Sequence, residues 1–95
     1  MTPKPPIEFS KIEALRKHML LTVKDMSELL GVSRMTYYGW VKGKPIRKSN
    51  DETVRKMLKR LLAVLVNHNW PPPEVIAASQ KERKERLVEI LEQGN

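Results

Sequence analysis

Residues 21–44 read LTVKDMSELLGVSRMTYYGWVKGK, and this stretch decides the fold. After Thr22, apolar residues recur every three or four positions, which is the spacing of one face of a helix. Gly31 suits the left-handed backbone that ends a helix, and Ser33 suits the capping position of the next one. The stretch therefore predicts two short helices joined through a Gly-Val-Ser turn, which is a helix-turn-helix.

Capping chemistry predicts where the other helices begin. A Ser or Thr side chain accepts a hydrogen bond from a first-turn amide, and an acidic residue three positions later bonds back. Four pairs have this spacing: Ser10/Glu13, Thr22/Asp25, Ser49/Glu52 and Ser79/Glu82. The helix after Ser33 is expected over residues 34–42, because Gly43 can end it, and a longer helix is expected over residues 50–67. Residues 73–92 are compatible with one exposed helix or with two helices joined near Ser79.

The helix expected over residues 50–67 has an apolar side and a basic side. The apolar side consists of Val54, Met57, Leu58, Leu61 and Leu65. The basic side consists of Arg55, Lys56, Lys59 and Arg60. We expect most of these cations to point into water. Residues 61–66 are apolar all round, which predicts that this end of the helix is covered on more than one side.

The length and composition indicate one small domain, and the helix signals predict that it is all-α with four to six helices. The chain has 95 residues, 40% of them apolar and 31% charged, which is ordinary for a chain that folds. No alternating run or hairpin signal predicts a strand. The absence of cysteine excludes disulfides and thiolate zinc sites. With no apolar stretch long enough for a signal peptide or a membrane span, the cytoplasm is the expected location.

The basic excess is confined to residues 34–60. This segment holds nine basic and two acidic residues, whereas the rest of the chain holds nine of each. Such a patch suits the phosphates of nucleic acid, although a basic helix face can also serve solubility alone.

Residues 21–44 resemble the helix-turn-helix of lambda-repressor-like, Cro-type repressors of phages and bacteria. The pattern of that family runs L-T-x-x-x-L-A-x-x-L-G-V-S-x-x-x-I-x-x-W-E-x-G. The residues that match it in register are Leu21, Thr22, Leu30, Gly31, Val32, Ser33, Trp40 and Gly43. The departures are Ser27 for Ala, Tyr37 for Ile and Val41 for Glu. With its flanking helices the resemblance extends over residues 11–66, and it implies double-stranded DNA as the partner in a bacterial cytoplasm or nucleoid.

The resemblance implies which residues contact the bases and which contact the phosphates. The implied base contacts are Arg34, Met35, Tyr38 and Gly39. The implied phosphate contacts around the helix starts are Thr22, Val23, Ser33 and Thr36. The cations expected to hold the DNA backbone are Lys42, Lys44, Arg47 and Lys48. Arg34 is the leading candidate for a base reader, because a guanidinium bonds bidentately to O6 and N7 of guanine.

Helical geometry divides residues 34–42 into the same two faces. Tyr37, Trp40 and Val41 lie on one side and are expected to pack on the protein. On the other side, Met35 and Tyr38 suit a thymine methyl or a sugar, with packing inside the chain as the alternative.

Gly39 is costly in a helix interior, by ~1 kcal/mol relative to Ala. One explanation is that the missing side chain permits close approach to the DNA. The other is that the helix frays near its end.

The family usually binds DNA as two-fold dimers, so the resemblance also implies a homodimer. The candidate interface residues are Leu65, Trp70, Val75, Ile76, Leu87, Ile90 and Leu91. The alternative is that these residues close the chain's own core. The expected organisation is an extended arm (residues 1–9), a helix-turn-helix domain (residues 10–69) and a C-terminal helical extension that is a candidate for dimerisation (residues 70–95).

No pattern for catalysis, for a metal, for a cofactor or for a small-molecule substrate is present. His18 and His68 are fifty residues apart and are expected at the surface or at helix ends. The sequence therefore favours a non-enzymatic, sequence-specific regulator of transcription, most simply a dimeric repressor that occludes a promoter. The alternatives are a DNA-binding module of phage packaging or recombination, and a protein-interaction adaptor that keeps the helix-turn-helix as a scaffold.

Overall fold

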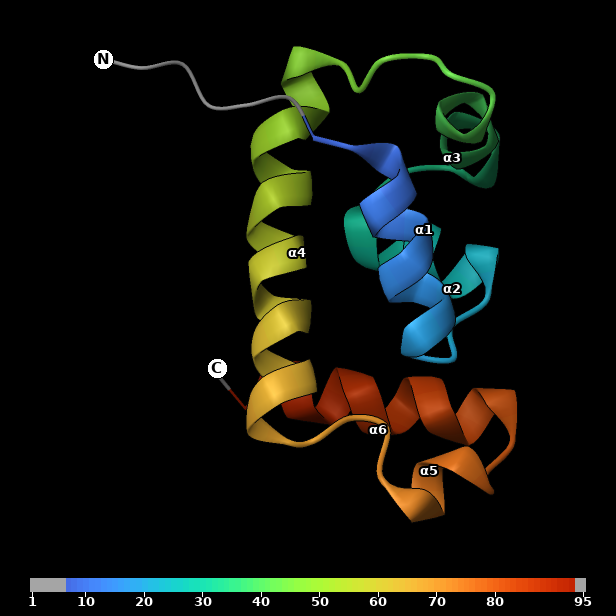
Figure 1. Ribbon diagram of the computed structural model, residues 1–95, viewed down its shortest axis with the longest axis vertical. Helices are drawn as coiled ribbons and strands as arrows, with labels where there is room; N and C mark the ends of the chain where they lie inside the picture. Colours follow the sequence, from blue (N-terminus) through green and yellow to red (C-terminus); the bar gives the residue numbers. More distant parts are fainter. Residues whose placement is uncertain (1–6, 94–95) are drawn as a thin grey trace.

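Six helices make up residues 7–93, the part of the chain that the computed structural model describes (Figure 1). They are α1 (Phe9–His18), α2 (Val23–Leu30), α3 (Arg34–Val41), α4 (Lys48–Asn67), α5 (Pro73–Ile76) and α6 (Gln80–Glu92). No strand occurs within residues 7–93, and the predicted all-α class is confirmed. Of the arm expected at residues 1–9, residues 1–6 lie outside this described part. None of the six helices combines the length and the apolar character that a membrane span needs.

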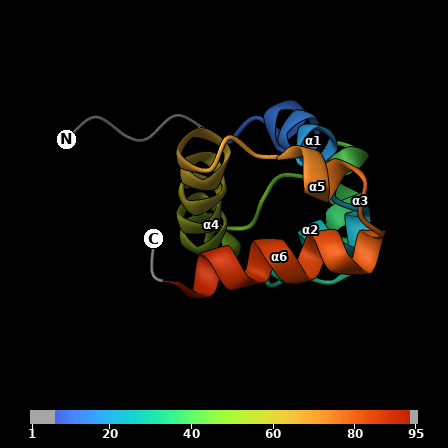
Figure 2. The ribbon, with the colours of Figure 1, turned by 90° about the horizontal axis from the view of Figure 1, so that it is seen from below.

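The other helices are arranged along one side of α4, the longest helix (Figure 1). α2 packs against α3 and α4, and α6 crosses the C-terminal end of α4 and packs against α4 and α5. Seen from below, α1 and α6 lie on opposite sides of the molecule (Figure 2). α2 is therefore held on several sides, while α3 lies at the edge of the assembly.

Three of the predicted caps are present. The Thr22 hydroxyl accepts from the Asp25 amide at 3.0 Å, and the Asp25 carboxylate accepts from the Thr22 amide at 3.2 Å, so α2 begins with a complete capping box. The hydroxyls of Ser33 and Ser79 accept from the amide three residues later and cap α3 and α6. Gly31 ends α2 with a φ of 74°, as predicted.

The caps predicted at Ser10 and Ser49 are wrong, because α1 and α4 both begin before these residues. Glu8 and Arg47 occupy the two capping positions, and neither helix start has a side-chain cap. The carboxylate of Glu13 instead accepts hydrogen bonds from Arg16 and from Tyr37. The helix expected over residues 34–42 ends one residue early, at position 41.

Residues 73–92 form two helices rather than one, α5 and α6. Arg83 on α6 donates to the carbonyl oxygens of Val75 at 3.0 Å and Ile76 at 2.7 Å, at the end of α5. Because a side chain satisfies these carbonyls, α5 can end without a further helical turn. Ser79 then starts α6, at the position where the sequence left a junction open.

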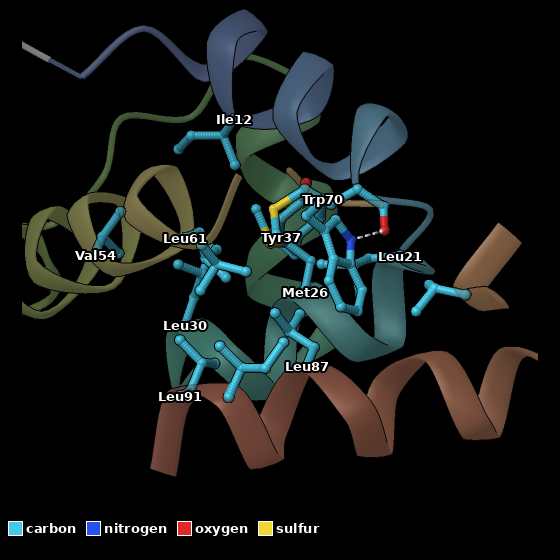
Figure 3. Close-up of a cluster of buried hydrophobic side chains, with 14 of the residues drawn as sticks. Ile12, Leu21, Met26, Leu30, Tyr37, Val54, Leu61, Trp70, Leu87 and Leu91 are labelled. Atoms are coloured by element: carbon cyan, nitrogen blue, oxygen red, sulfur yellow. Dashed lines mark hydrogen bonds between the residues drawn. The ribbon is translucent and has the colours of Figure 1, made fainter. Parts of the chain in front are cut away.

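One hydrophobic core joins all six helices (Figure 3). Its buried residues extend along the chain from Ile12 on α1 to Leu91 on α6. Trp70, in the connection between α4 and α5, lies within this cluster, and its indole Nε1 donates to the Met19 carbonyl at 3.0 Å. This hydrogen bond ties the C-terminal part of the chain to the connection between α1 and α2.

Most of the residues considered for a dimer interface lie inside this core. The buried ones are Trp70, Val75, Leu87, Ile90 and Leu91. Leu65 is partly buried against the core, and Ile76 is 53% exposed. Five of the seven residues therefore close the chain's own core, which was the alternative, and they are not available at the surface for a second chain.

The C-terminal end of α4 is covered on fewer sides than its apolar sequence predicted. Leu61 and Val64 are buried, but Leu62 is 49% exposed and Val66 is 75% exposed. The prediction of cover on more than one side of residues 61–66 is wrong for the side that carries Leu62 and Val66, because no helix of the described chain packs over it.

Replacing Leu87 with Ala tests whether α6 belongs to the common core. Leu87 is buried, so we expect its truncation to lower the free energy of unfolding by about 2–5 kcal/mol, measured by urea unfolding followed by circular dichroism. Ile76→Ala is the control at a half-exposed site and should change that free energy by less than about 0.5 kcal/mol. Equal small losses for both variants would contradict the shared core.

Candidate nucleic-acid interface

α3 turns one face to the protein and the other to solvent. Tyr37 and Trp40 are buried, as predicted. Met35 is 83% exposed and Tyr38 is 50% exposed, so neither residue fills a gap in the core. Val41 was expected on the buried side, but it is half exposed, because α3 ends at this residue and the chain turns away. The outward face therefore carries an unusual combination of a basic residue, Arg34, with apolar side chains.

An aromatic cluster fixes the inner face of α3 against α1. The ring of Phe9 meets Tyr37 edge-on, with centroids 5.1 Å apart, and Trp40 in the same manner at 6.1 Å. The Tyr37 and Trp40 rings are themselves 6.0 Å apart. Edge-to-face contacts of this kind are directional, so they set the rotation of α3 about its axis as well as its position.

A polar network beside these rings adds a second anchor. The Tyr37 hydroxyl donates to Oε1 of Glu13 at 2.6 Å, and Nη2 of Arg16 donates to Oε2 of the same carboxylate at 2.8 Å. Arg16 also donates to the Leu21 carbonyl at 3.0 Å. α1 thereby contacts both α3 and the chain segment that leads into α2.

The network changes the acidity of its members. The hydrogen bond from Arg16 lowers the pKa of Glu13 below its ordinary value of 4.5, and the Tyr37 hydroxyl lowers it further, although burial acts in the opposite direction. Burial, followed by the hydrogen bond to Glu13, raises the pKa of Tyr37. Glu13 is therefore held as a carboxylate and Tyr37 as a neutral donor.

This network was missed at the level of sequence, although one signal for it was present. Tyr37 stands where the resembling pattern has Ile, and a buried hydroxyl needs a partner. The second departure, Ser27 for Ala, follows the same rule: its buried hydroxyl donates to the Val23 carbonyl at 2.7 Å. Ser27 finds its partner within α2 and Tyr37 finds its partner on α1, and no buried side-chain N or O in residues 7–93 is left without one.

Two threonines keep a hydroxyl donor at the helix starts. Oγ1 of Thr22 is used as an acceptor in the capping box, so its hydrogen remains free to donate. At the start of α3, Ser33 donates to Oγ1 of Thr36 at 3.0 Å, which leaves the Thr36 hydroxyl hydrogen available. The hydroxyl hydrogen of Ser33 is used inside the chain, and Val23 is partly buried against the core, so the expected contacts of these two residues would come from their backbone amides.

The C-terminal helix α6 holds the start of α2. Nε2 of Gln80 donates to the buried Asp25 carboxylate at 2.9 Å and to the Leu20 carbonyl at 2.9 Å. Lys84 forms ion pairs with Asp25, at 3.9 Å, and with Glu28. Because Asp25 closes the capping box of Thr22, α6 supports the end of α2 that is expected near the DNA.

The four cations at the end of α3 and in the following loop are free of intrachain partners. All of them are exposed, and within residues 7–93 none forms an ion pair: Lys42, Lys44, Arg47 and Lys48. The cations of the α4 basic side differ, since Arg55 pairs with Asp51 at 2.6 Å and Lys56 with Glu52 at 3.2 Å. Arg60 donates to the Leu91 carbonyl at 2.7 Å, so it faces α6 rather than water.

Gly39 and Lys44 lie against each other. The Lys44 amide donates to the Gly39 carbonyl at 3.0 Å, and a β-carbon built on Gly39 would be 3.3 Å from Cδ of Lys44. Gly43, with a φ of 101°, provides the turn that brings Lys44 back over α3. Because Gly39 has no side chain, there is room at the end of the outward face for the methylene carbons of the Lys44 side chain. Gly39 lies within α3, two residues before its end at Val41.

Replacing Glu13 with Gln is expected to reduce the acid sensitivity of the fold. Since the pKa of Glu13 is lowered in the folded state, its stabilising contribution is full above its ordinary pKa and is lost as the pH falls through the lowered value. In urea unfolding from about pH 7 to about pH 3, wild type should exceed Glu13→Gln most near neutrality, and the difference should shrink below about pH 4. Glu85→Gln, at an exposed position of α6, is the control. A difference that does not vary with pH would contradict this role of the carboxylate.

Comparison with known protein families agrees with the fold and with this arrangement of α2 and α3. A family model described as helix-turn-helix matches residues 12–61, just over half of the chain. The match extends from α1 into α4 and ends before α5 and α6. Searches of curated proteins and of solved structures found no match. On the strength of the family match, the chain belongs to the lambda-repressor-like helix-turn-helix family of DNA-binding proteins.

Proposed function

We propose that this protein is a sequence-specific, double-stranded DNA-binding regulator of transcription that acts as a dimeric repressor of phage or bacterial type. The observation that carries the proposal is the outward face of α3, where exposed Arg34, Met35 and Tyr38 lie on a helix anchored from behind by Tyr37 and Trp40. Family membership supports DNA as the partner.

In this proposal α3 enters the major groove and its outward side chains read base edges. Arg34 lies in the first turn of α3, the part of a reading helix that reaches the bases, and its guanidinium matches O6 and N7 of guanine. Met35 and Tyr38 are apolar and exposed, which suits the methyl group of thymine. Exposed apolar side chains on a short helix are costly in water, and a groove contact would remove that cost.

Phosphate contacts on both sides of α3 would set its position in the groove. Thr22 and Thr36 hold hydroxyl donors at the starts of α2 and α3, where first-turn amides also suit an anion. Four cations without an ion pair in residues 7–93 add to these contacts: Lys42, Lys44, Arg47 and Lys48. These contacts provide affinity without sequence preference.

A regulator of this type would occlude a promoter by covering it. One reading helix spans few base pairs, and two copies related by a two-fold axis double the site, with half-sites ~34 Å apart on one side of the duplex. With DNA as its partner, the protein of this proposal would act in the bacterial cytoplasm, on the nucleoid.

Selection from a random duplex library at about 150 mM salt, with excess competitor DNA, tests the proposal. We expect wild type to recover a two-fold symmetric motif and Arg34→Ala to lose discrimination at one base pair in each half-site, by about 1–3 kcal/mol. Arg86→Ala, on the outer side of α6, is the matched control and should recover the wild-type motif.

If wild type recovers no motif, the regulator proposal fails. The salt dependence of the remaining binding then separates the two alternatives. A steep dependence, with ~0.9 in slope for each phosphate contact, indicates a DNA module of packaging or recombination. Weak binding at physiological salt indicates a protein-interaction adaptor.

Gly39→Ala tests why the reading helix contains a glycine. The new methyl group meets only the flexible stem of Lys44, so we expect the free energy of unfolding to rise by up to ~1 kcal/mol while DNA binding weakens. Urea unfolding and titration of the selected duplex measure the two effects. A more stable variant that binds as well as wild type would rule out close approach to the DNA.

The same substitution in a Lys44→Ala background identifies the cause of weaker binding. If Gly39→Ala still weakens binding there, the DNA itself approaches the glycine. If the substitution has no further effect there, its influence is confined to displacing the Lys44 stem.

A further inference from the structure

We propose that two copies of this chain associate through the groove between α1 and α4 together with the exposed side of the C-terminal half of α4. The inference rests on the dimeric part of the proposed function and names the surface that would serve it. It replaces the interface suggested by the sequence, most of which lies in the core.

The groove has an apolar floor. About 760 Å³ of space lies between the two helices. The apolar residues that line it are Ile7, Ile12, Leu15, Leu58 and Leu62. An apolar recess of this size on a small chain is a surface that favours a partner over water.

A projecting pair of side chains lies next to this recess. Leu62 is at the edge of the groove, and Val66 follows it one turn later on the same side of α4. These are the two exposed large apolar residues of α4, and Val66 is more exposed than any other large apolar residue of residues 7–93 except Met35. A two-fold interface needs a surface that complements itself, with a projection on each copy that fits a recess on the other. The groove and the Leu62–Val66 ridge provide both features on one surface.

The charges around the groove identify a second copy, rather than nucleic acid, as the occupant. The rim carries four cations and three acids. Three ion pairs join them, Lys11 with Glu8, Arg55 with Asp51 and Lys56 with Glu52, and the fourth cation, Lys59, lies outside these pairs. With one positive charge in excess, such a rim attracts phosphates less than the loop after α3 does and repels an identical rim only weakly. Because each copy offers cations and anions in the same places, rotation by a two-fold axis can set opposite signs against each other.

The position of α3 is compatible with this interface. The residues that line the groove belong to α1, to α4 and to the segment before α1, and none belongs to α3. Two copies that meet there would therefore leave the outward faces of both α3 helices uncovered.

Sedimentation velocity of the full chain from about 1 to 100 µM, the range in which weak dimers dissociate, is the first test. We expect a concentration-dependent dimer for wild type. Leu62→Glu and Val66→Glu should each raise the dimer dissociation constant about tenfold or more, since a buried apolar anchor becomes a charge. Ile76→Glu is the matched control, with similar exposure to that of Leu62 on another helix, and should leave dimerisation unchanged.

A second measurement separates this inference from the proposed function. Both α4 variants should still bind a duplex with one half-site as wild type does, but should lose the added affinity for the two-fold site. A wild type that stays monomeric at 100 µM and on the two-fold site would overturn the inference, and so would α4 variants that dimerise like wild type. If the dimer forms through α4 but no DNA motif is selected, the interface stands and the regulator proposal fails.

Discussion

An eight-residue helix is too short to be stable by itself in water, and α3 has this length. The helix that faces solvent with Arg34, Met35 and Tyr38 therefore depends on contacts made by its opposite side. Tyr37 and Trp40 provide them through the Phe9 ring, and the Tyr37 hydroxyl adds a hydrogen bond to Glu13. Aromatic packing and this hydrogen bond together leave α3 little freedom to rotate, so its outward face is defined before any partner binds.

α2 also depends on contacts from other helices, and the C-terminal helix α6 provides them. The family match ends at residue 61, yet α6 contributes to the core and reaches the start of α2 through Gln80 and Lys84. The carboxylate of Asp25 accepts hydrogen bonds both from the Thr22 amide, as part of the cap of α2, and from Gln80 on α6. In this chain the extension is therefore a structural support of the helix-turn-helix, and its apolar residues are used for that purpose.

Two surfaces of the molecule differ in how their charges are used. Around α3, cations remain without partners, which is the state that suits phosphates. Around the groove between α1 and α4, three of the four cations are paired with acids one helical turn away, as in Arg55 with Asp51 and Lys56 with Glu52. The positive charges of residues 34–60 therefore differ in their surroundings: those after α3 have no ion pair within the described chain, whereas Arg55 and Lys56 on α4 are each paired with an acid.

The sequence by itself determined the features that depend on near neighbours along the chain: the helix-turn-helix, the left-handed Gly31, the caps at Thr22, Ser33 and Ser79, and the buried sides of Tyr37 and Trp40. Only the tertiary structure decided that α1 and α4 begin without side-chain caps, that Trp70 and Leu87 belong to the core, and that Leu62 and Val66 remain exposed. The reason is physical. A cap or a turn is satisfied within a few residues, whereas burial and the pairing of Glu13 depend on partners as distant as α3, which no local pattern encodes.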